Sequence, residues 1–386
     1  MSQPSPYTPG EIAHEVPGRA DHLDRIADLL AVMSTRRRLA GRVHVFVGPR
    51  GVGKTSLLRE AQRQAEAVGH ATVFVTAGHG DLVATLVEAI GLGPLRWQVE
   101  SVGSRLRELG LSVGVPGARV NATFEGGADP TVVRRLEDLL RSTARASHED
   151  GRVGTVIFID ELQAGDRPGL RALAYAWQHL QADPDGLPLA LVGAGLGHTE
   201  DVVTDAASFA ERFAYRQVGS LEEAATREAL SAPATALGVA WEMDALTEVV
   251  DRTRGYPYFV QVHGDAVWDA AGRPDPGSAL TRAHVAAARQ GVVDDLDALY
   301  RSRWSKASPS EQRFLTAMAG RAHERVRRGD IASALGVSTE ALGMARRSLM
   351  DKGLIEVAGH GLLSFTVPGF REFVRESADL GEERVR

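Results

Sequence analysis

Eight residues near the N-terminus, Gly48 to Thr55, have the GxxxxGK[ST] pattern of a phosphate-binding loop. They follow the apolar run 43–47 and lead into 56–61, which has the composition of a helix. Glycines let backbone N–H groups close around phosphate oxygens, and a helix N-terminus adds partial positive charge. Lys54 adds a full charge, and the hydroxyl of Thr55 suits Mg²⁺. This context favours a nucleotide site over a glycine-rich turn without a ligand. The predicted contacts are Gly48, Pro49, Arg50, Gly51, Val52, Gly53, Lys54, Thr55 and Ser56.

Two carboxylates supply the second half of the predicted site. The apolar residues 156–159 have the character of a buried parallel strand, and Asp160 and Glu161 follow at its carboxyl end. Ligands of open α/β sheets bind outside the carboxyl ends of the strands. We therefore expect Asp160 and Thr55 to hold Mg²⁺, Asp160 to contribute to the nucleotide site, and Glu161 to polarise the attacking water. The alternative is a pair of solvated acids that end a core strand.

Composition limits the classes of protein to consider. The 386 residues are enough for two or three domains, and 44% of them are hydrophobic. No apolar run approaches 18 residues, so we expect no membrane span, and the N-terminus lacks the features of a secretory signal. The chain has no cysteine, which fits a reducing cytoplasm, the location that we expect. Its 12 histidines show no metal-binding spacing.

Apolar and amphipathic segments alternate from residue 21 to residue 218. The predicted strands are 43–47, 70–76, 153–159, 187–192 and 213–218. The predicted helices are 21–33, 54–67, 81–90, 131–146 and 170–181. This alternation predicts a parallel αβα sandwich, an α/β fold with helices on both faces of the sheet. The segment 91–130 does not fit the pattern, and we interpret it as an insertion.

The predicted domain organisation has three folded parts. A nucleotide-binding domain covers 15–220, and alanine-rich amphipathic segments without strands form a helical lid over 221–300. A third domain covers 301–378. A proline-rich segment, 1–14, precedes them and is expected to be flexible, and a short tail, 379–386, follows.

The third domain has the pattern of a winged helix-turn-helix. A helix starts at Pro309, a short one covers 330–335, and a second helix is predicted over 339–352 with Ser338 as its cap. A hairpin over 354–365 would be the wing. Residues 301–360 carry eleven basic and six acidic side chains, although the whole chain has a net charge of −6. We therefore expect double-stranded DNA as a partner. The candidate contacts are Thr339, Arg346 and Arg347.

On these motifs the chain resembles AAA+ ATPases of the origin-recognition-like and STAND-like branch. It is similar to actinobacterial ATP-binding proteins with a C-terminal winged helix, and the resemblance covers roughly residues 7–378. It implies ATP as the nucleotide, slow hydrolysis, and assembly into homo-oligomers through the ATPase domain. Pro17-Gly18-Arg19 resembles the family's entry segment near the adenine.

Three further segments match the family less closely. Arg212, within 211–213, resembles an arginine finger that would act catalytically, although it could equally be a cation at a helix end. Pro257, within 255–257, resembles the GxP segment of STAND proteins and would contact the nucleotide; an ordinary helix-entry turn is the alternative. The segment 193–195 lies where sensor 1 is expected, but it lacks the usual polar side chain.

Three functions are compatible with these observations. The first is an ATP-driven switch whose winged helix binds duplex DNA. The second is a STAND-type signalling ATPase, in which the winged helix regulates the nucleotide domain and the partner is a protein. The third is a transposition or replication helper that forms ATP-dependent oligomers on DNA. The basic excess in 301–360 favours the first or the third, and the GxP-like segment favours the second.

Overall fold

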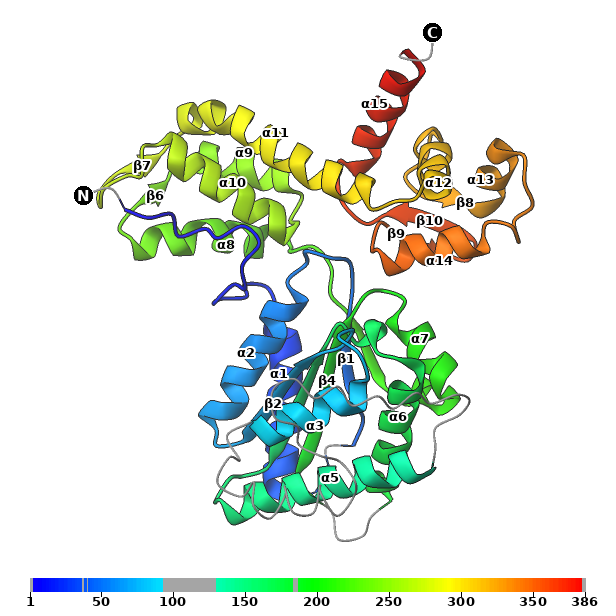
Figure 1. Cartoon of the computed structure of the whole chain (residues 1–386). Coiled ribbons are helices and arrows are strands. Elements are labelled where there is room, and N and C mark those ends of the chain that lie inside the picture. The colour runs from blue at the N-terminus through cyan, green and yellow to red at the C-terminus, as the bar shows by residue number, and fades with distance from the viewer. Residues whose placement is uncertain (1–2, 37, 40, 93–129, 183–186, 384–386) are drawn as a thin grey trace. The chain divides into compact units, whose positions relative to one another are not determined.

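A five-stranded parallel sheet organises the N-terminal half of the chain (Figure 1). The computed structural model describes residues 3–36, 38–39, 41–92, 130–182 and 187–383. They divide into two compact units, one formed by 19–47 and 54–217, the other by 1–18, 48–53 and 218–386. Apart from its ends, 91–92 and 130, the predicted insertion lies outside the described residues.

The sheet has the strand order β2-β3-β4-β1-β5, and every neighbouring pair is parallel. Its strands are β1 (His44–Val47), β2 (Ala71–Thr76), β3 (Thr155–Asp160), β4 (Leu189–Gly195) and β5 (Ala214–Gln217). All residues of β3 and β4 are buried, as expected for strands that are covered on both faces. Because the strands are parallel, the carboxyl ends of β1, β3 and β4 lie at one edge of the sheet.

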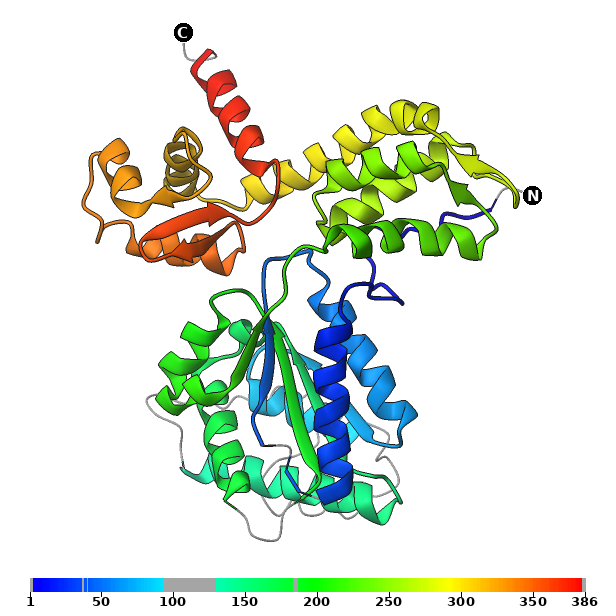
Figure 2. The same ribbon diagram turned by 180° about the vertical axis from the view of Figure 1, so that it is seen from behind.

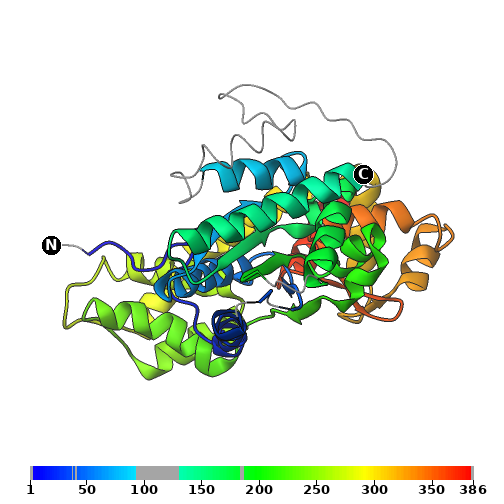
Figure 3. The ribbon, with the colours of Figure 1, turned by 90° about the horizontal axis from the view of Figure 1, so that it is seen from below.

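Helices cover both faces of this sheet. One face carries α1 (Ala20–Arg36) and α2 (Lys54–Ala67). The other carries α3 (Leu82–Leu92), α5 (Pro130–Glu149), α6 (Arg167–Gln181) and α7 (Thr199–Ala206). Figure 2 shows α1 lying across the sheet, and Figure 3 shows α1 and α5 on opposite sides of it. The predicted αβα sandwich is therefore confirmed.

Asp166 ties two of these helices together. Its side chain accepts hydrogen bonds from Gly169 N at 2.8 Å, at the start of α6, and from Leu82 N at 2.7 Å, at the start of α3. Each bond satisfies a backbone donor that a helix N-terminus leaves free. One carboxylate thus fixes the starts of two helices on the same face.

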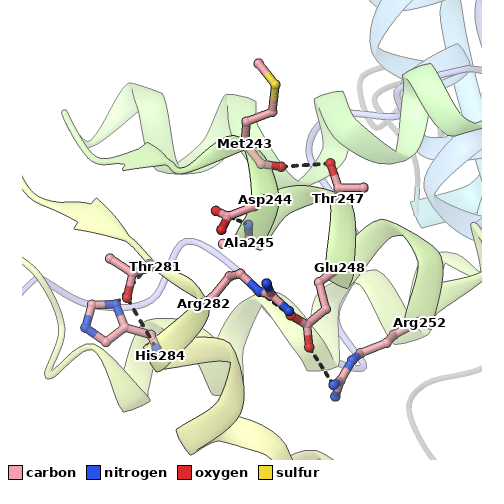
Figure 4. Close-up of polar contacts among 9 residues, drawn as sticks. All are labelled: Met243, Asp244, Ala245, Thr247, Glu248, Arg252, Thr281, Arg282 and His284. Atoms are coloured by element: carbon pink, nitrogen blue, oxygen red, sulfur yellow. Dashed lines mark hydrogen bonds and ion pairs between the residues drawn. The ribbon is translucent and has the colours of Figure 1, made fainter.

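The lid in the other unit is built from four helices, α8 (Glu223–Ala236), α9 (Met243–Thr253), α10 (Pro257–Ala270) and α11 (Arg282–Ser305). Glu248 on α9 pairs with Arg252 at 2.6 Å and with Arg282 of α11 at 3.1 Å (Figure 4). The prediction that strands stop after residue 221 is wrong in detail. A short parallel pair joins β6 (Ala240–Trp241) to β7 (Ala279–Leu280).

The N-terminal segment packs on this lid. Tyr7 is buried, its hydroxyl donates to Leu230 O at 2.5 Å, and it accepts from Trp241 Nε1 at 3.0 Å. The side chain of Gln3 donates to Pro274 O at 2.8 Å. The prediction of a flexible segment over 1–14 is therefore wrong for residues 3–7, because the aromatic ring of Tyr7 enters the lid core.

The C-terminal part combines helices with a small antiparallel sheet of order β8-β10-β9. Its elements are α12 (Pro309–Ala319), β8 (Val326–Arg327), α13 (Arg328–Leu335), α14 (Gly343–Asp351), β9 (Ile355–Gly359), β10 (Leu362–Phe365) and α15 (Phe370–Glu383). Helix, turn, helix and hairpin follow in the order expected of a winged helix. Lys352 pairs with the buried Glu311 at 2.5 Å, which fixes the end of α14 against α12.

The predicted start of the second helix is wrong by four residues, because α14 begins at Gly343 and not at Thr339. Gly343 N donates to Glu340 O at 3.0 Å, and Ser338 Oγ accepts from Ala341 N at 3.4 Å. These bonds close a tight turn, which competes locally with the first helical turn. Thr339 therefore lies in the turn before α14.

A buried histidine makes the stability of the lid depend on pH. Burial in α10, aided by the charge of Arg252, lowers the pKa of His263 to about 4. The folded state thus keeps His263 neutral where the unfolded chain, with a pKa near 6.5, binds a proton. Stability is then full above pH 6.5 and falls as the pH approaches 4, by about 2 kcal/mol between pH 7 and pH 5.

Urea denaturation at pH 7 and pH 5 checks this expectation in the wild type and in His263→Gln. In His263→Gln, the loss of about 2 kcal/mol of stability between pH 7 and pH 5 that is due to His263 should be absent. An equally steep decline in the variant would contradict it.

Candidate nucleotide site

Two oxygen-bearing side chains meet at the carboxyl edge of the sheet. Thr55, the second residue of α2, donates from Oγ1 to Asp160 Oδ2 at 2.6 Å, and Asp160 is the last residue of β3. Asp160 Oδ1 accepts from Glu161 N at 2.9 Å. The parallel sheet thus brings together residues that are 105 positions apart in the chain.

The donor set fits Mg²⁺, which prefers carboxylate and hydroxyl oxygens. Burial raises the pKa of Asp160, although its bonds to Thr55 and to the Glu161 N–H, and the nearby charge of Lys54, counteract this. A buried carboxylate with few water contacts gains most from a bound cation. Thr55 and Asp160 are therefore the residues that would hold the metal, as the sequence predicts.

Lys54 and Ser56 extend the site on α2. Lys54 begins the helix and is only 6% exposed, and Ser56 is 7% exposed. A lysine with so little exposure at a helix N-terminus is unusual, because the helix dipole and the side chain are both positive there. An anionic ligand would stabilise this arrangement, which is consistent with phosphate binding.

Glu161 has a strained backbone. Its φ of 51° and ψ of 40° place it in the left-handed region, which only two other non-glycine residues adopt in the described chain. Such strain costs on the order of 1 kcal/mol or more and tends to persist at functional sites. Glu161 lies directly before the short helical turn η2 (Leu162–Ala164).

Gln163 and Thr199 are polar residues of this edge to which the sequence analysis assigned no role, although Gln163 belongs to the segment Asp160-Glu161-Leu162-Gln163 on which the family resemblance partly rests. Gln163 Nε2 donates to Glu161 Oε2 at 2.5 Å, and its Oε1 accepts from Leu196 N at 2.9 Å. Thr199 Oγ1 lies 3.3 Å from the same Oε1. The sequence gives no signal for the role of Gln163, because its contact with Leu196, 33 positions away, depends on how η2 packs against the end of β4.

The loop 48–53 belongs to the other unit of the structure. Gly51 and Gly53 have φ values of 82° and 87°, which L side chains rarely adopt. Within that unit the Tyr256 hydroxyl donates to Arg50 O, and Tyr258 N donates to Gly51 O at 3.3 Å. Pro257 lies between these two tyrosines as the first residue of α10.

Arg212 lies at the opposite edge of the sheet from Asp160. It ends the short helix η3 (Ser208–Arg212), two residues before β5, and is exposed. A groove of about 240 Å³ surrounds it. The groove is lined by Arg42, Ala174, Trp177, Gln178, Gln181, Phe209 and Phe213. Arg42 precedes β1, so the groove marks the amino edge. Arg212 is therefore not brought together with Lys54 and Asp160.

The candidate DNA contacts lie in the C-terminal part. Arg346 and Arg347 are in the first half of α14, half-buried and exposed respectively. The sequence did not single out Arg327 and Arg325, which are exposed at β8, next to the wing strand β10. Arg327 lies beside β10 because it pairs with Leu362, and sequence spacing does not reveal this pairing.

Comparison with protein families places this site in a known class. Residues 15–192 match the family described as an AAA ATPase domain, and this span contains Lys54, Thr55, Asp160 and Glu161. This part of the chain is therefore similar to AAA ATPase domains. Residues 297–374 match a family described only as a domain of unknown function.

Two solved structures share the fold over nearly the whole chain. One is the ORC2 protein of Aeropyrum pernix, in ADPNP and ADP complexes, with a TM-score of 0.60, 14% identity, and coverage of 97% of this chain and 96% of that one. The other is a Walker-type ATPase of Pyrococcus abyssi, with a TM-score of 0.58, 15% identity, and coverage of 97% and 98%. Together with the family match, they confirm the predicted resemblance to AAA+ ATPases, and at 14–15% identity the two structures show a shared fold alone.

One curated protein shares a short segment. Lon protease 1 of Myxococcus xanthus is 35% identical over 88 residues, which cover 19% of this chain and 11% of the protease. The chain thus spans about a tenth of that relative. None of the helices in the described part of the chain combines the length and apolar character needed to cross a bilayer.

The geometry predicts that Lys54→Ala weakens Mg·ATP binding by roughly 30-fold to 1,000-fold, because a charge-assisted contact in a dry site contributes about 2–4 kcal/mol. Isothermal titration with a slowly hydrolysed ATP analogue measures this. Lys306→Ala removes an exposed lysine outside the site and serves as the control. Wild-type affinity in Lys54→Ala would refute the site.

Proposed function

We propose that this protein is a nucleotide-dependent switch that binds Mg·ATP, hydrolyses it slowly, and binds double-stranded DNA through its winged helix. The single observation that carries the ATPase part is the 2.6 Å contact between Thr55 and Asp160 beside the nearly buried Lys54. The match of residues 15–192 to AAA ATPase domains supports the same conclusion.

In this proposal the backbone of 48–53, together with Lys54 and Ser56, binds the phosphates. Thr55 and Asp160 hold Mg²⁺, which neutralises phosphate charge when bound. Glu161 orients the attacking water and accepts its proton. Pro257 is proposed to contact the nucleotide from the start of α10.

Arg212 is proposed to act on a second copy of the chain. Its position at the amino edge of the sheet, away from Asp160, supports a role in trans, because a guanidinium cannot act on phosphates at the opposite edge of its own sheet. Arginine fingers of this kind stabilise the charge that develops during phosphoryl transfer. The proposal therefore includes a homo-oligomer.

Turnover measurements test both catalytic roles. Glu161→Gln keeps the shape of the side chain but cannot accept a proton, so turnover should fall roughly 10²–10⁴-fold while ATP still binds. Arg212→Ala should also lose turnover, and added Lys54→Ala subunits should restore part of it by supplying their own Arg212. Wild-type turnover in Glu161→Gln would refute the first role. A rate strictly proportional to protein concentration, without rescue, would refute the second.

DNA binding is supported by the charge and geometry of the C-terminal part. Arg346 and Arg347 lie on α14, and adjacent helical positions point about 100° apart, so they would meet different parts of the duplex. Arg325 and Arg327 are two further exposed basic side chains, at β8 beside strand β10. Lys352 is excluded from this set, because it pairs with the buried Glu311.

Replacing Arg346 and Arg347 by alanine should weaken duplex binding and reduce the magnitude of the slope of log K against log[salt] by about one to two. Fluorescence anisotropy with a random duplex at several salt concentrations, with and without ATP, measures this. The matched control replaces two exposed lid arginines, Arg273 and Arg289. Wild-type protein without salt-sensitive duplex binding would refute the DNA proposal.

A specific observation favours the signalling ATPase as second candidate. Tyr256 and Tyr258 of the lid bind the backbone of the loop 48–53, and the Arg50 side chain lies beside Gly353, just after α14. A phosphate loop held in this way could report its nucleotide to the winged helix. In that case the Arg346/Arg347 variant would bind DNA like wild type and would raise ATP turnover.

A further inference from the structure

The end of β4 lacks a polar side chain of its own. The sequence 193–195 is Gly-Ala-Gly, and all three residues belong to the buried strand. In the structure, a side chain from another element supplies the polar group. Gln163, in η2, reaches the backbone just after β4 and accepts from Leu196 N at 2.9 Å.

The two ends of the Gln163 amide have different partners. A backbone N–H can only donate, so the side-chain oxygen must face Leu196. The amide nitrogen then faces Glu161 and donates to its Oε2 at 2.5 Å. The orientation of the amide is therefore fixed by chemistry, and it presents a donor to the carboxylate.

Gly195 makes room for this arrangement. A Cβ atom built on Gly195 would lie 2.4 Å from Gln163 Oε1 and 2.2 Å from Thr199 Oγ1. Both distances are far below van der Waals contact, so any side chain there would displace the amide. The position of the Gln163 amide therefore depends on the lack of a side chain at Gly195.

The bond from Gln163 to Glu161 acts on a residue with a strained backbone. Glu161 has a left-handed backbone, which an L residue adopts at a cost. Its own N–H is bound to Asp160 Oδ1 at 2.9 Å, which fixes the backbone but not the carboxylate. Gln163 binds one carboxylate oxygen, Oε2, and so restrains the side chain as well.

We propose that Gln163 is a positioning residue for ATP hydrolysis, which links the Glu161 carboxylate to the end of β4. This inference rests on the proposed function of Glu161. Gln163 itself touches no reacting atom. It holds one oxygen of the base and thereby sets the direction from which the other can accept a proton from water. Thr199, 3.3 Å from the amide oxygen, supports its far end.

A positioning role and a structural role give different kinetics. If Gln163 only tied η2 to β4, its loss would lower stability or nucleotide affinity. If it positions Glu161, its loss lowers kcat and leaves ATP affinity and KM almost unchanged. It also has no further effect once Glu161 has lost its carboxylate, because two residues that act as a unit are not additive.

The experiment measures kcat, KM and ATP affinity for Gln163→Met in wild-type and Glu161→Gln backgrounds. Methionine keeps the length and volume but cannot form either hydrogen bond. We expect kcat to fall roughly 10-fold to 100-fold in the wild-type background and less than 3-fold in Glu161→Gln, with ATP affinity within about 3-fold throughout. Gln290→Met is the control, because it removes a similar bond, from Gln290 Nε2 to Asp294 Oδ1 at 2.9 Å, on an exposed helix.

Gly195→Ala provides a second route to the same result. It leaves Gln163 intact but fills its place, and the flexible end of the side chain can move aside. It should reproduce the loss of kcat at unchanged ATP affinity. Wild-type kcat in Gln163→Met, or an equal loss in both backgrounds, would overturn the proposal. Wild-type protein with no more turnover than Lys54→Ala would instead refute the proposed ATPase itself.

Discussion

The contact between Thr55 and Asp160 depends on the register of a parallel sheet. β3 pairs with β2 and β4, and these strands carry α2 on one face, so the start of α2 and the end of β3 meet at one edge. Thr55 and Asp160 are then 2.6 Å apart. A buried carboxylate needs such a donor, because an unpaired charge in a dry site would cost several kcal/mol. The hydrogen bond between Thr55 and Asp160 therefore stabilises the fold. The same two side-chain oxygens are also suited to bind a cation.

The carboxyl edge contains a second layer of polar contacts around this pair. Asp160 accepts the Glu161 N–H, Glu161 accepts the Gln163 amide, and Gln163 accepts Leu196 N. Each bond occupies a polar group that the surrounding apolar strands would otherwise leave unpaired. The chain of bonds leads from Asp160 to the end of β4 and gives the strained Glu161 a defined geometry.

In the C-terminal part, one buried carboxylate, Glu311, has several partners. Buried Glu311 caps α12 through Ser308 and also binds Lys352, and these bonds hold the pKa of Glu311 down, at about 2, although burial acts in the opposite direction. The basic side chains of this region therefore have two kinds of position: some pair with buried groups of the fold, and others lie exposed at the surface. Lys352 serves packing, whereas Arg325, Arg327 and Arg347 remain exposed on α14 and beside the wing.

The sequence by itself determined the sheet, the order of its elements and the nucleotide motifs, because glycine spacing, apolar runs and charge are local properties of the chain. It also grouped Lys54, Thr55 and Asp160 into one predicted site, and the structure places the Thr55 hydroxyl 2.6 Å from Asp160 Oδ2. It misplaced the start of α14, where a local turn outcompetes helix, and it took residues 3–7 as flexible, because the partner of Tyr7 is more than 200 residues away. Only the tertiary structure decided that Gln163 fills the space beside Gly195, since that depends on the packing of one strand end against another element.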